Sequence, residues 1–133
     1  MKLADITMKS QSAQQIIESL KRAQRIAKIG SWDWNIVDNT ESWSDEQFRI
    51  FGYELLSVKP NHQLFIDSIH KDDKVRVFKA IDDILAYDTP FDLEYRIHCH
   101  QGQLKWIHSQ GYVYRDDKGD PIRMIGTMHD ITN

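Results

Sequence analysis

The stretch DKGDPIRMIGTMHDITN, residues 117–133, contains the segment that decides the fold. DKGDP has the composition of a turn, and IRMIGTMHDIT has that of a strand, which closes on Asp130-Ile131-Thr132. Thr132 and Asn133 are both residues that favour the N-cap of a helix. We therefore expect this strand to lie in a sheet and to point toward a helix that would follow it.

Two more strands precede this one and are joined to it in series. FDLEYRIHC, residues 91–99, alternates strictly, with Phe91, Leu93 and Tyr95 on the same face as Ile97 and Cys99. The turn HQGQ leads from it into LKWIHSQGYVYRD, residues 104–116, and DKGDP leads onward to the last strand. Short turns join antiparallel neighbours, so these three strands form an antiparallel sheet.

The middle of the chain alternates between strand and helix patterns. SWDWNIV and ESWS, joined by DNT, form a hairpin, and Ser44 with Gln47 has the capping-box spacing of a short helix. A second short helical piece, NHQLFIDSI, follows Pro60. HKDDKVRVFKAIDDILAYD, residues 70–88, is the longest helical pattern of this region, ending before Pro90. Its first turn is expected to hold Asp72 and Asp73, and its buried face Val75, Phe78, Ile81 and Leu85. The fold class is therefore α+β, a five-stranded antiparallel sheet flanked by short helices and one long helix.

The N-terminal segment differs from the rest of the chain in composition and in hydrophobic pattern. Residues 8–29 lack Gly and Pro and carry a narrow apolar stripe at helical spacing. The stripe consists of Ile16, Ile17, Leu20, Ala23 and Ala27. We expect Gly30 to end this amphipathic helix. A narrow stripe suits a seam with a partner helix or a lid over a sheet.

Composition narrows the classes of protein. The chain has 133 residues, 41% hydrophobic and 28% charged, with a net charge of −3. These values fit one globular domain, and no basic patch or stripe suggests a nucleic acid as partner. No apolar run approaches the roughly 20 residues of a membrane span. The single cysteine, Cys99, fits a reducing compartment, so we expect a cytoplasmic domain, whether or not a longer protein is anchored in a membrane elsewhere.

Six motifs in sequence resemble a PAS sensory domain, of the bacterial subgroup found in sensor histidine kinases and diguanylate cyclases. They are RIAKIGSWDWNI, WSDEQFRIFGY, IHKDDKVRV, FDLEYRI, GQLKWI and DKGDPIRMIGTMHDIT, from Arg25 to Thr132. One departure is Lys71, where the family commonly has proline. The resemblance implies a PAS domain over residues 30–133, and the N-terminal segment, residues 1–29, is predicted to be an amphipathic helix that caps the sheet or dimerises the protein.

The resemblance also implies a role for the last strand. In this family the Asp-Ile-Thr triplet joins the sheet to an output helix, so the segment is expected to be an excised input module of a signalling enzyme. A strand that is simply the natural end of the chain is the alternative. Ligand or partner binding would be relayed to a C-terminal histidine kinase or diguanylate cyclase, with Asp130 as a latch and Thr132 as the cap of the output helix.

Cofactor and metal chemistry find little support in the residues. His70 sits at the start of the long helix, where some relatives ligate haem, but cofactor-free relatives share this histidine. Cys99 lies at a strand end, away from the position of the flavin-reactive cysteine in light-oxygen-voltage relatives. His98, His100 and His108 lack an obvious fourth metal ligand. No catalytic motif is present, so we expect no catalytic residue and no metal site. A redox sensor that binds haem or flavin stays a less favoured alternative.

A ligand cavity is the remaining candidate site. In ligand-binding relatives the ligand lies between the inner face of the sheet and the helices. By that resemblance the lining would be Phe65, Ile66, Ile69, Phe78, Leu93, Tyr95, Ile97, Ile107, Ser109, Gly126 and Met128. Gly126 matches a position where a backbone must approach a ring, and Met128 one where flavin-binding relatives carry glutamine. A small metabolite or a fatty molecule would fit such a lining, and the alternative is an ordinary packed core.

The outer face of the sheet suggests a second function. If Ile107 points inward, Trp106, Tyr112 and Tyr114 form an aromatic stripe on the opposite face. An exposed aromatic surface of this kind is expected to be covered by another helix or by a partner protein. The stripe of Ile16, Leu20, Ala23 and Ala27 would provide it, from the same chain or from a partner. The alternative to a ligand sensor is therefore a constitutive homodimerisation module without a ligand.

Overall fold

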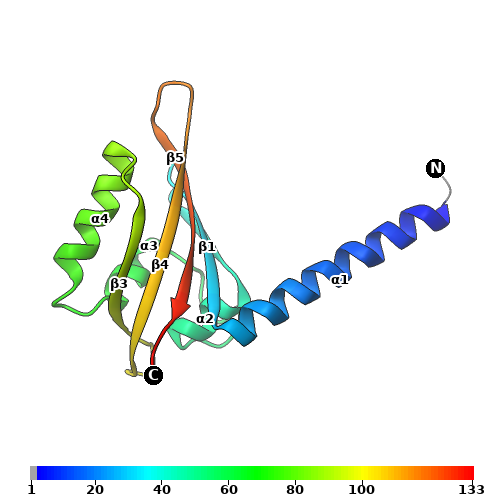
Figure 1. The fold of residues 1–133 in the computed structure, drawn as a ribbon, viewed down its shortest axis with the longest axis horizontal. Helices are drawn as coiled ribbons and strands as arrows, with labels where there is room; N and C mark the ends of the chain where they lie inside the picture. Colours follow the sequence, from blue (N-terminus) through cyan, green and yellow to red (C-terminus); the bar gives the residue numbers. More distant parts are fainter. Residues whose placement is uncertain (1–2) are drawn as a thin grey trace.

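The computed structural model describes residues 3–133, with side chains from Ser10 onward. Its elements are, in chain order, α1 (Leu3–Ala27), β1 (Ile29–Asn35), β2 (Thr40–Trp43), α2 (Asp45–Phe51), α3 (His62–Ser68), α4 (Lys74–Tyr87), β3 (Phe91–His98), β4 (Leu104–Arg115) and β5 (Pro121–Asp130). The strands form one antiparallel sheet in the order β2-β1-β5-β4-β3. The α+β class and the five-stranded sheet predicted from the sequence are confirmed (Figure 1).

Strand β5 is the centre of the sheet because it pairs with β1 on one side and β4 on the other. Gly126 is the partner of both Trp32 and Gly111, which fixes the register of the three strands. The inner face presents the strand residues of the core: Phe91, Tyr95, Ile97, Ile107, Val113, Met124 and Met128. The last strand therefore runs through the middle of the domain, between its two halves.

Side-chain caps start two short helices. The Ser44 hydroxyl accepts a hydrogen bond from the Gln47 N–H at 3.3 Å, and the Asn61 side chain accepts one from the Leu64 N–H at 2.9 Å. Only half of the predicted capping box forms, because the Ser44 N–H donates to the Ser31 carbonyl at 3.0 Å. The Gln47 amide nitrogen donates to the Met128 sulfur at 3.2 Å. Gln47 thereby ties α2 to β5.

The start and the buried face of α4 differ from the sequence prediction. The helix begins at Lys74, so Asp72 and Asp73 precede its first turn. Its buried residues are Val77, Ile81 and Ile84. Val75 and Phe78, by contrast, are 81% and 37% exposed. The predicted stripe, which begins at Val75, and the observed stripe, which begins at Val77, share Ile81 and both have helical spacing. The position of the helix on the sheet selects the observed stripe.

Helix α1 projects away from the sheet, joined to it only at its C-terminal end (Figure 1). It ends at Ala27, and Lys28 takes the left-handed conformation with φ 57°. The prediction that Gly30 ends the helix is wrong, since Gly30 is a buried residue of β1. A Cβ there would lie 2.6 Å from the Gln47 amide oxygen, which accounts for glycine at this position.

The predicted stripe on α1 faces solvent in this chain. Ile16 is 61% exposed and Leu20 60%, and Ala23 and Ala27 are exposed as well. The helix therefore does not cover the outer face of its own sheet. Of the helices within residues 3–133, none combines the length and hydropathy needed to cross a bilayer.

Candidate functional site

The candidate site is a cavity on the inner face of the sheet. Its walls come from β1, β2, β3 and β5 and from α2, α3 and α4. The lining residues are Trp32, Trp34, Glu41, Trp43, Phe51, His62, Phe65, Ile81, Phe91, Tyr95, Met124 and Met128. The centre of a water-sized sphere can move through about 30 Å³ of this space. A single water needs about 10–15 Å³ by the same measure, so the cavity suits a compact group.

Aromatic rings make up most of the wall and contact one another. The Trp34 and His62 rings stack with their centroids 4.3 Å apart and their planes 9° apart. Trp43 lies 4.7 Å from Phe51, again between ring centroids. Trp32, Trp34 and Trp43 are neither fully buried nor exposed. The cavity is thus bounded by aromatic rings on the side of β1 and β2.

The Trp32 indole lies across a pair of glycines in the centre of the sheet. Gly111 and Gly126 face each other on β4 and β5. A Cβ at Gly126 would overlap the Trp32 ring and the Gln110 carbonyl oxygen, and one at Gly111 would lie 3.3 Å from the same ring. The ring that lies close to the backbone of Gly126 is therefore the indole of Trp32 and not that of a ligand, so the predicted approach of a ligand ring stays a prediction.

Glu41 is the acidic residue of the cavity wall. It lies on the edge strand β2, where it is the partner of Trp34, and both side chains face inward. Its Oε2 atom is buried and has no hydrogen-bond partner among the described residues. Burial raises the pKa of Glu41 to about 7, and a hydrogen bond from the Trp43 side chain opposes the rise.

The other titratable groups of the wall are neutral near pH 7. Burial lowers the pKa of His62, and burial raises that of the Tyr95 phenol. The Tyr95 hydroxyl shares a buried hydrogen bond of 2.7 Å with the Ser109 hydroxyl. Among the lining residues that the structure describes, none is a lysine or an arginine. The negative charge of Glu41 has no counter-charge in the cavity.

Three of the predicted cavity residues line this space: Phe65, Tyr95 and Met128. Eight others do not, namely Ile66, Ile69, Phe78, Leu93, Ile97, Ile107, Ser109 and Gly126. Ile69, Ile97 and Ile107 are fully buried and pack together as core, Ser109 is bonded to Tyr95, and Trp32 covers Gly126. Phe78 faces partly outward with its stripe of α4.

The sequence prediction missed the half of the cavity that β1 and β2 form. The signal was the alternation of SWDWNIV, which puts Trp32 and Trp34 on one face of a strand. The hairpin register then places Glu41 and Trp43 on that same face. Trp32, Trp34 and Trp43 pack against the core, and they also form part of the cavity wall.

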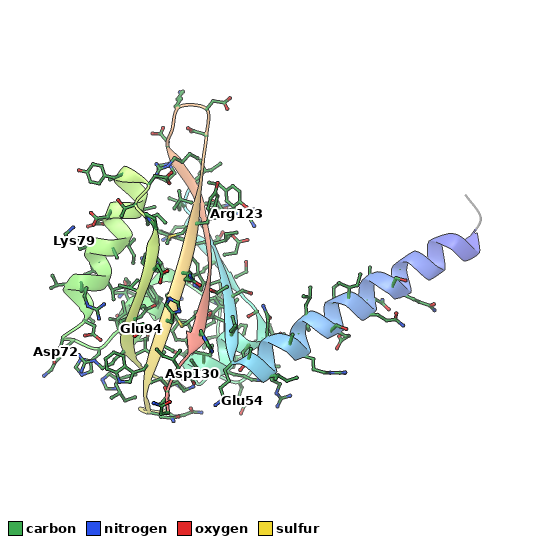
Figure 2. The ribbon with its side chains drawn as sticks, viewed as in Figure 1. Glu54, Asp72, Lys79, Glu94, Arg123 and Asp130 are labelled. Carbon is green, nitrogen blue, oxygen red and sulfur yellow. The ribbon has the colours of Figure 1, made fainter. Side chains whose placement is uncertain are left out.

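The second feature is the junction at the end of β5, where Figure 2 places Asp130 close to the base of α1. The Asp130 N–H donates to the Lys28 carbonyl, and the Ile131 N–H to the Trp106 carbonyl, each at 3.0 Å. The Asp130 carboxylate accepts from the Thr132 N–H at 3.0 Å, and its other oxygen lies 3.9 Å from the Lys105 ammonium. The Thr132 hydroxyl accepts from the Trp106 N–H at 3.0 Å. The junction joins the ends of α1, β4 and β5.

The residues weighed for cofactors and metals lie elsewhere. The His70 ring nitrogen accepts a hydrogen bond from the Asp72 N–H at 3.1 Å, before α4, and His70 is outside the cavity lining. Cys99 is buried against the Ile50 carbonyl, and its pKa is raised by burial. Within residues 3–133, no group of three potential metal ligands comes together.

The predicted outer-face aromatics are exposed on the face opposite the cavity. Trp106, Tyr112 and Tyr114 lie on β4 with large exposed fractions. The Arg96 guanidinium lies 5.3 Å from the centre of the Trp106 ring, and Tyr112 and Tyr114 meet edge to face. The aromatic stripe is therefore present, with arginine as part of its surroundings.

Comparison with known proteins identifies the family. A family model described as the PAS fold matches residues 40–128. The chain belongs to the PAS family and is a sensor domain related to those of histidine kinases and diguanylate cyclases. It is 30% identical over 120 residues to a probable diguanylate cyclase, DgcE, of Escherichia coli, covering 90% of this chain and 11% of that protein. It is 26% identical over 116 residues to a blue-light-activated histidine kinase of Brucella anthropi, covering 86% of this chain and 23% of the relative.

A solved structure gives the same picture. The crystal structure of a sensory box histidine kinase/response regulator from Burkholderia thailandensis is 34% identical, with a TM-score of 0.74, covering 85% of this chain and 84% of the other. The chain spans only about a tenth to a quarter of the curated relatives. The relatedness therefore concerns one domain of much longer proteins.

The size and the lining of the cavity bear on the haem and flavin alternatives. About 30 Å³ of space for a water-sized sphere is far below the roughly 300–1,000 Å³ of drug-sized ligand sites. None of the residues that line it is an asparagine or glutamine that could meet the polar edge of a flavin. The histidine of the wall, His62, is stacked on Trp34.

Proposed function

We propose that the chain is a signal-input domain that relays occupancy of the cavity to a C-terminal effector through Asp130-Ile131-Thr132. The observation that carries the proposal is the path of β5. Met124 and Met128 line the cavity, and Asp130 follows Met128 by two residues in the junction. A ligand that favours one packing of β5 over another would shift the populations of two junction states.

The junction has the contacts that such a relay requires. Its hydrogen bonds join α1, β4 and β5 at one point, through the carbonyls of Lys28 and Trp106. Lys105 also donates to the Ile50 carbonyl at 2.9 Å, which links Asp130 to the end of α2. A small movement of β5 would therefore alter the geometry at the place where an effector helix would begin.

The test is the Asp130→Ala variant in the protein that carries the effector. Loss of the carboxylate releases the Thr132 N–H and Lys105, so the stimulus-dependent change in effector activity should fall by most of its amplitude. The unfolding midpoint is measured in parallel, because the Asp130 side chain is only 13% exposed and its loss also has a cost in stability. Asp117→Ala removes an exposed acid in the β4–β5 turn and is the control. A full response in Asp130→Ala would overturn the relay.

A dimerisation module is the second candidate function, and the exposed stripe of α1 favours it. Exposure of the apolar side chains of Ile16 and Leu20 to water is unfavourable, because burying such side chains contributes about 1.5–3 kcal/mol each. A second copy of the chain would cover them. In Ile16→Glu/Leu20→Glu the molar mass from light scattering should fall to that of a monomer, whereas Gln11→Glu/Gln14→Glu on the polar face should leave it unchanged. Equal masses in both variants would contradict the dimer.

A further inference from the structure

The chemistry of the cavity wall narrows the class of ligand. Seven of the twelve lining residues are tryptophan, phenylalanine or tyrosine. The π-face of such a ring carries partial negative charge, which attracts cations and repels anions. A wall of this kind favours either an apolar group or an organic cation over a carboxylate or phosphate.

Glu41 decides between the apolar group and the cation. Its Oε2 atom is buried without a hydrogen-bond partner among the described residues, facing a space that contains no other ionised group near pH 7. An apolar ligand would leave this carboxylate unpaired, which is costly in a low-dielectric site. An organic cation would pair with it and at the same time lie against the aromatic faces.

We propose that the cavity binds a compact organic cation, an ammonium or methylated ammonium head group, with Glu41 as its counter-ion and Trp32, Trp34 and Trp43 as its aromatic wall. This inference rests on the proposed function, in which the cavity is the sensory site. The space accessible in the cavity, about two to three times what one water needs, suits such a head group.

Binding should depend on pH through Glu41. The groups that face it are His62 of α3 and Tyr95 of β3, both neutral near pH 7, while Trp34 and Trp43 do not titrate. The cation binds the ionised form of Glu41, and half of this group is protonated at about pH 7 in the free protein. Affinity should therefore rise about tenfold between pH 6 and pH 8.

The experiment is a calorimetric titration of the chain with choline and with 3,3-dimethylbutan-1-ol, which has the same shape and no charge. Choline should bind more than about ten times tighter than the neutral alcohol. Glu41→Gln should abolish that preference and the pH dependence, while Glu54→Gln, an exposed glutamate outside the cavity, should behave like the wild type. Equal binding of the two compounds, or no binding of choline, would overturn the proposal.

Failure of this inference can be told apart from failure of the relay. Asp130→Ala leaves the cavity wall intact and should bind choline like the wild type. Choline binding with an unchanged effector response in Asp130→Ala would contradict the relay alone. If Asp130→Ala loses the effector response but the wild-type chain does not bind choline, only the proposal that the ligand is a cation is contradicted. If the pH dependence of choline affinity persists in Glu41→Gln, the counter-ion of the ligand is a group other than Glu41.

Discussion

Two carboxylates at opposite ends of the sheet have opposite surroundings. Asp73, before α4, accepts hydrogen bonds from the Arg96 guanidinium at 2.8 and 3.0 Å and from its backbone N–H at 2.8 Å. The Arg96 side chain lowers the pKa of Asp73 to about 2, whereas burial raises the pKa of Glu41 to about 7. Asp73 thus has a charged partner for both of its oxygens, whereas the Oε2 atom of Glu41 has no hydrogen-bond partner among the described residues.

The two ends differ in packing in the same way. Tyr95, Ile97, Ile107 and Ser109 on β3 and β4 are essentially without exposed surface. The tryptophans of β1 and β2 are only partly buried and leave a cavity between them and α3. The β3–β4 end is therefore packed as core, whereas the tryptophans of the β1–β2 end border the cavity.

The largest effect is expected when the satisfied carboxylate is removed. Asp73→Asn should lower the free energy of unfolding by about 3 kcal/mol at pH 7, because Arg96 loses its charge partner and bidentate contact. The folded pKa lies below the ordinary value of 3.8, so this contribution exists above that pH and is lost as the pH falls toward 2. Denaturant unfolding at pH 7 and pH 3 measures it. Asp72→Asn, on the exposed neighbour, should have little effect, and an equal loss in both variants would contradict the assignment.

Removal of the Glu41 carboxylate is expected to raise the free energy of unfolding, whereas removal of the Asp73 carboxylate lowers it. The folded pKa of Glu41 lies above the ordinary value of 4.5, so its ionisation destabilises the fold progressively from pH 4.5 to 7 and by a constant amount above. Glu41→Gln should therefore be about 2 kcal/mol more stable than the wild type at pH 8, allowing for partial exposure, and equal to it near pH 4. Unfolding of both proteins at the two pH values tests this. A destabilised variant at pH 8 would mean that Glu41 has a structural partner.

A smaller effect is expected at the boundary of the two ends, where Tyr95 belongs to both the core and the cavity wall. Tyr95→Phe removes the hydrogen bond to Ser109 and leaves that hydroxyl buried, at a cost of about 1 kcal/mol. Adding Ser109→Ala removes the stranded hydroxyl as well. In a double-mutant cycle by chemical denaturation the double variant should lose less than the sum of the single losses. Strict additivity would show that the two hydroxyls do not interact.

The β3–β4 end could be predicted from the sequence together with its buried face, whereas for the β1–β2 end only the hairpin could be predicted, and not its part in the cavity wall. FDLEYRIHC alternates over nine residues, which fixes both its strand type and its buried face. ESWS has only four residues, too few for a pattern, and the face that Glu41 shares with Trp34 depends on the hairpin register. An acidic residue on an inner face also contradicts the expectation that strands hide apolar side chains and expose charged ones.

Long-range packing accounts for the remaining differences. On α4 two stripes of similar hydrophobicity share Ile81, and only contact with the sheet selects the one with Val77 and Ile84. Gly30 carries the signal of a helix end, but its role is to make room for Gln47 of α2. Neither choice is visible in local spacing, because each depends on residues distant in the sequence.

The most direct test of the relay is the response of the junction to ionisation of Glu41. The amide N–H resonances of Asp130, Ile131 and Thr132 are followed by NMR from pH 5 to pH 8 in the wild type and in Glu41→Gln. The relay predicts a component with its midpoint near pH 7 that is present in the wild type and absent from the variant. Identical titrations of the three amides in both proteins would show that the cavity and the junction are not coupled.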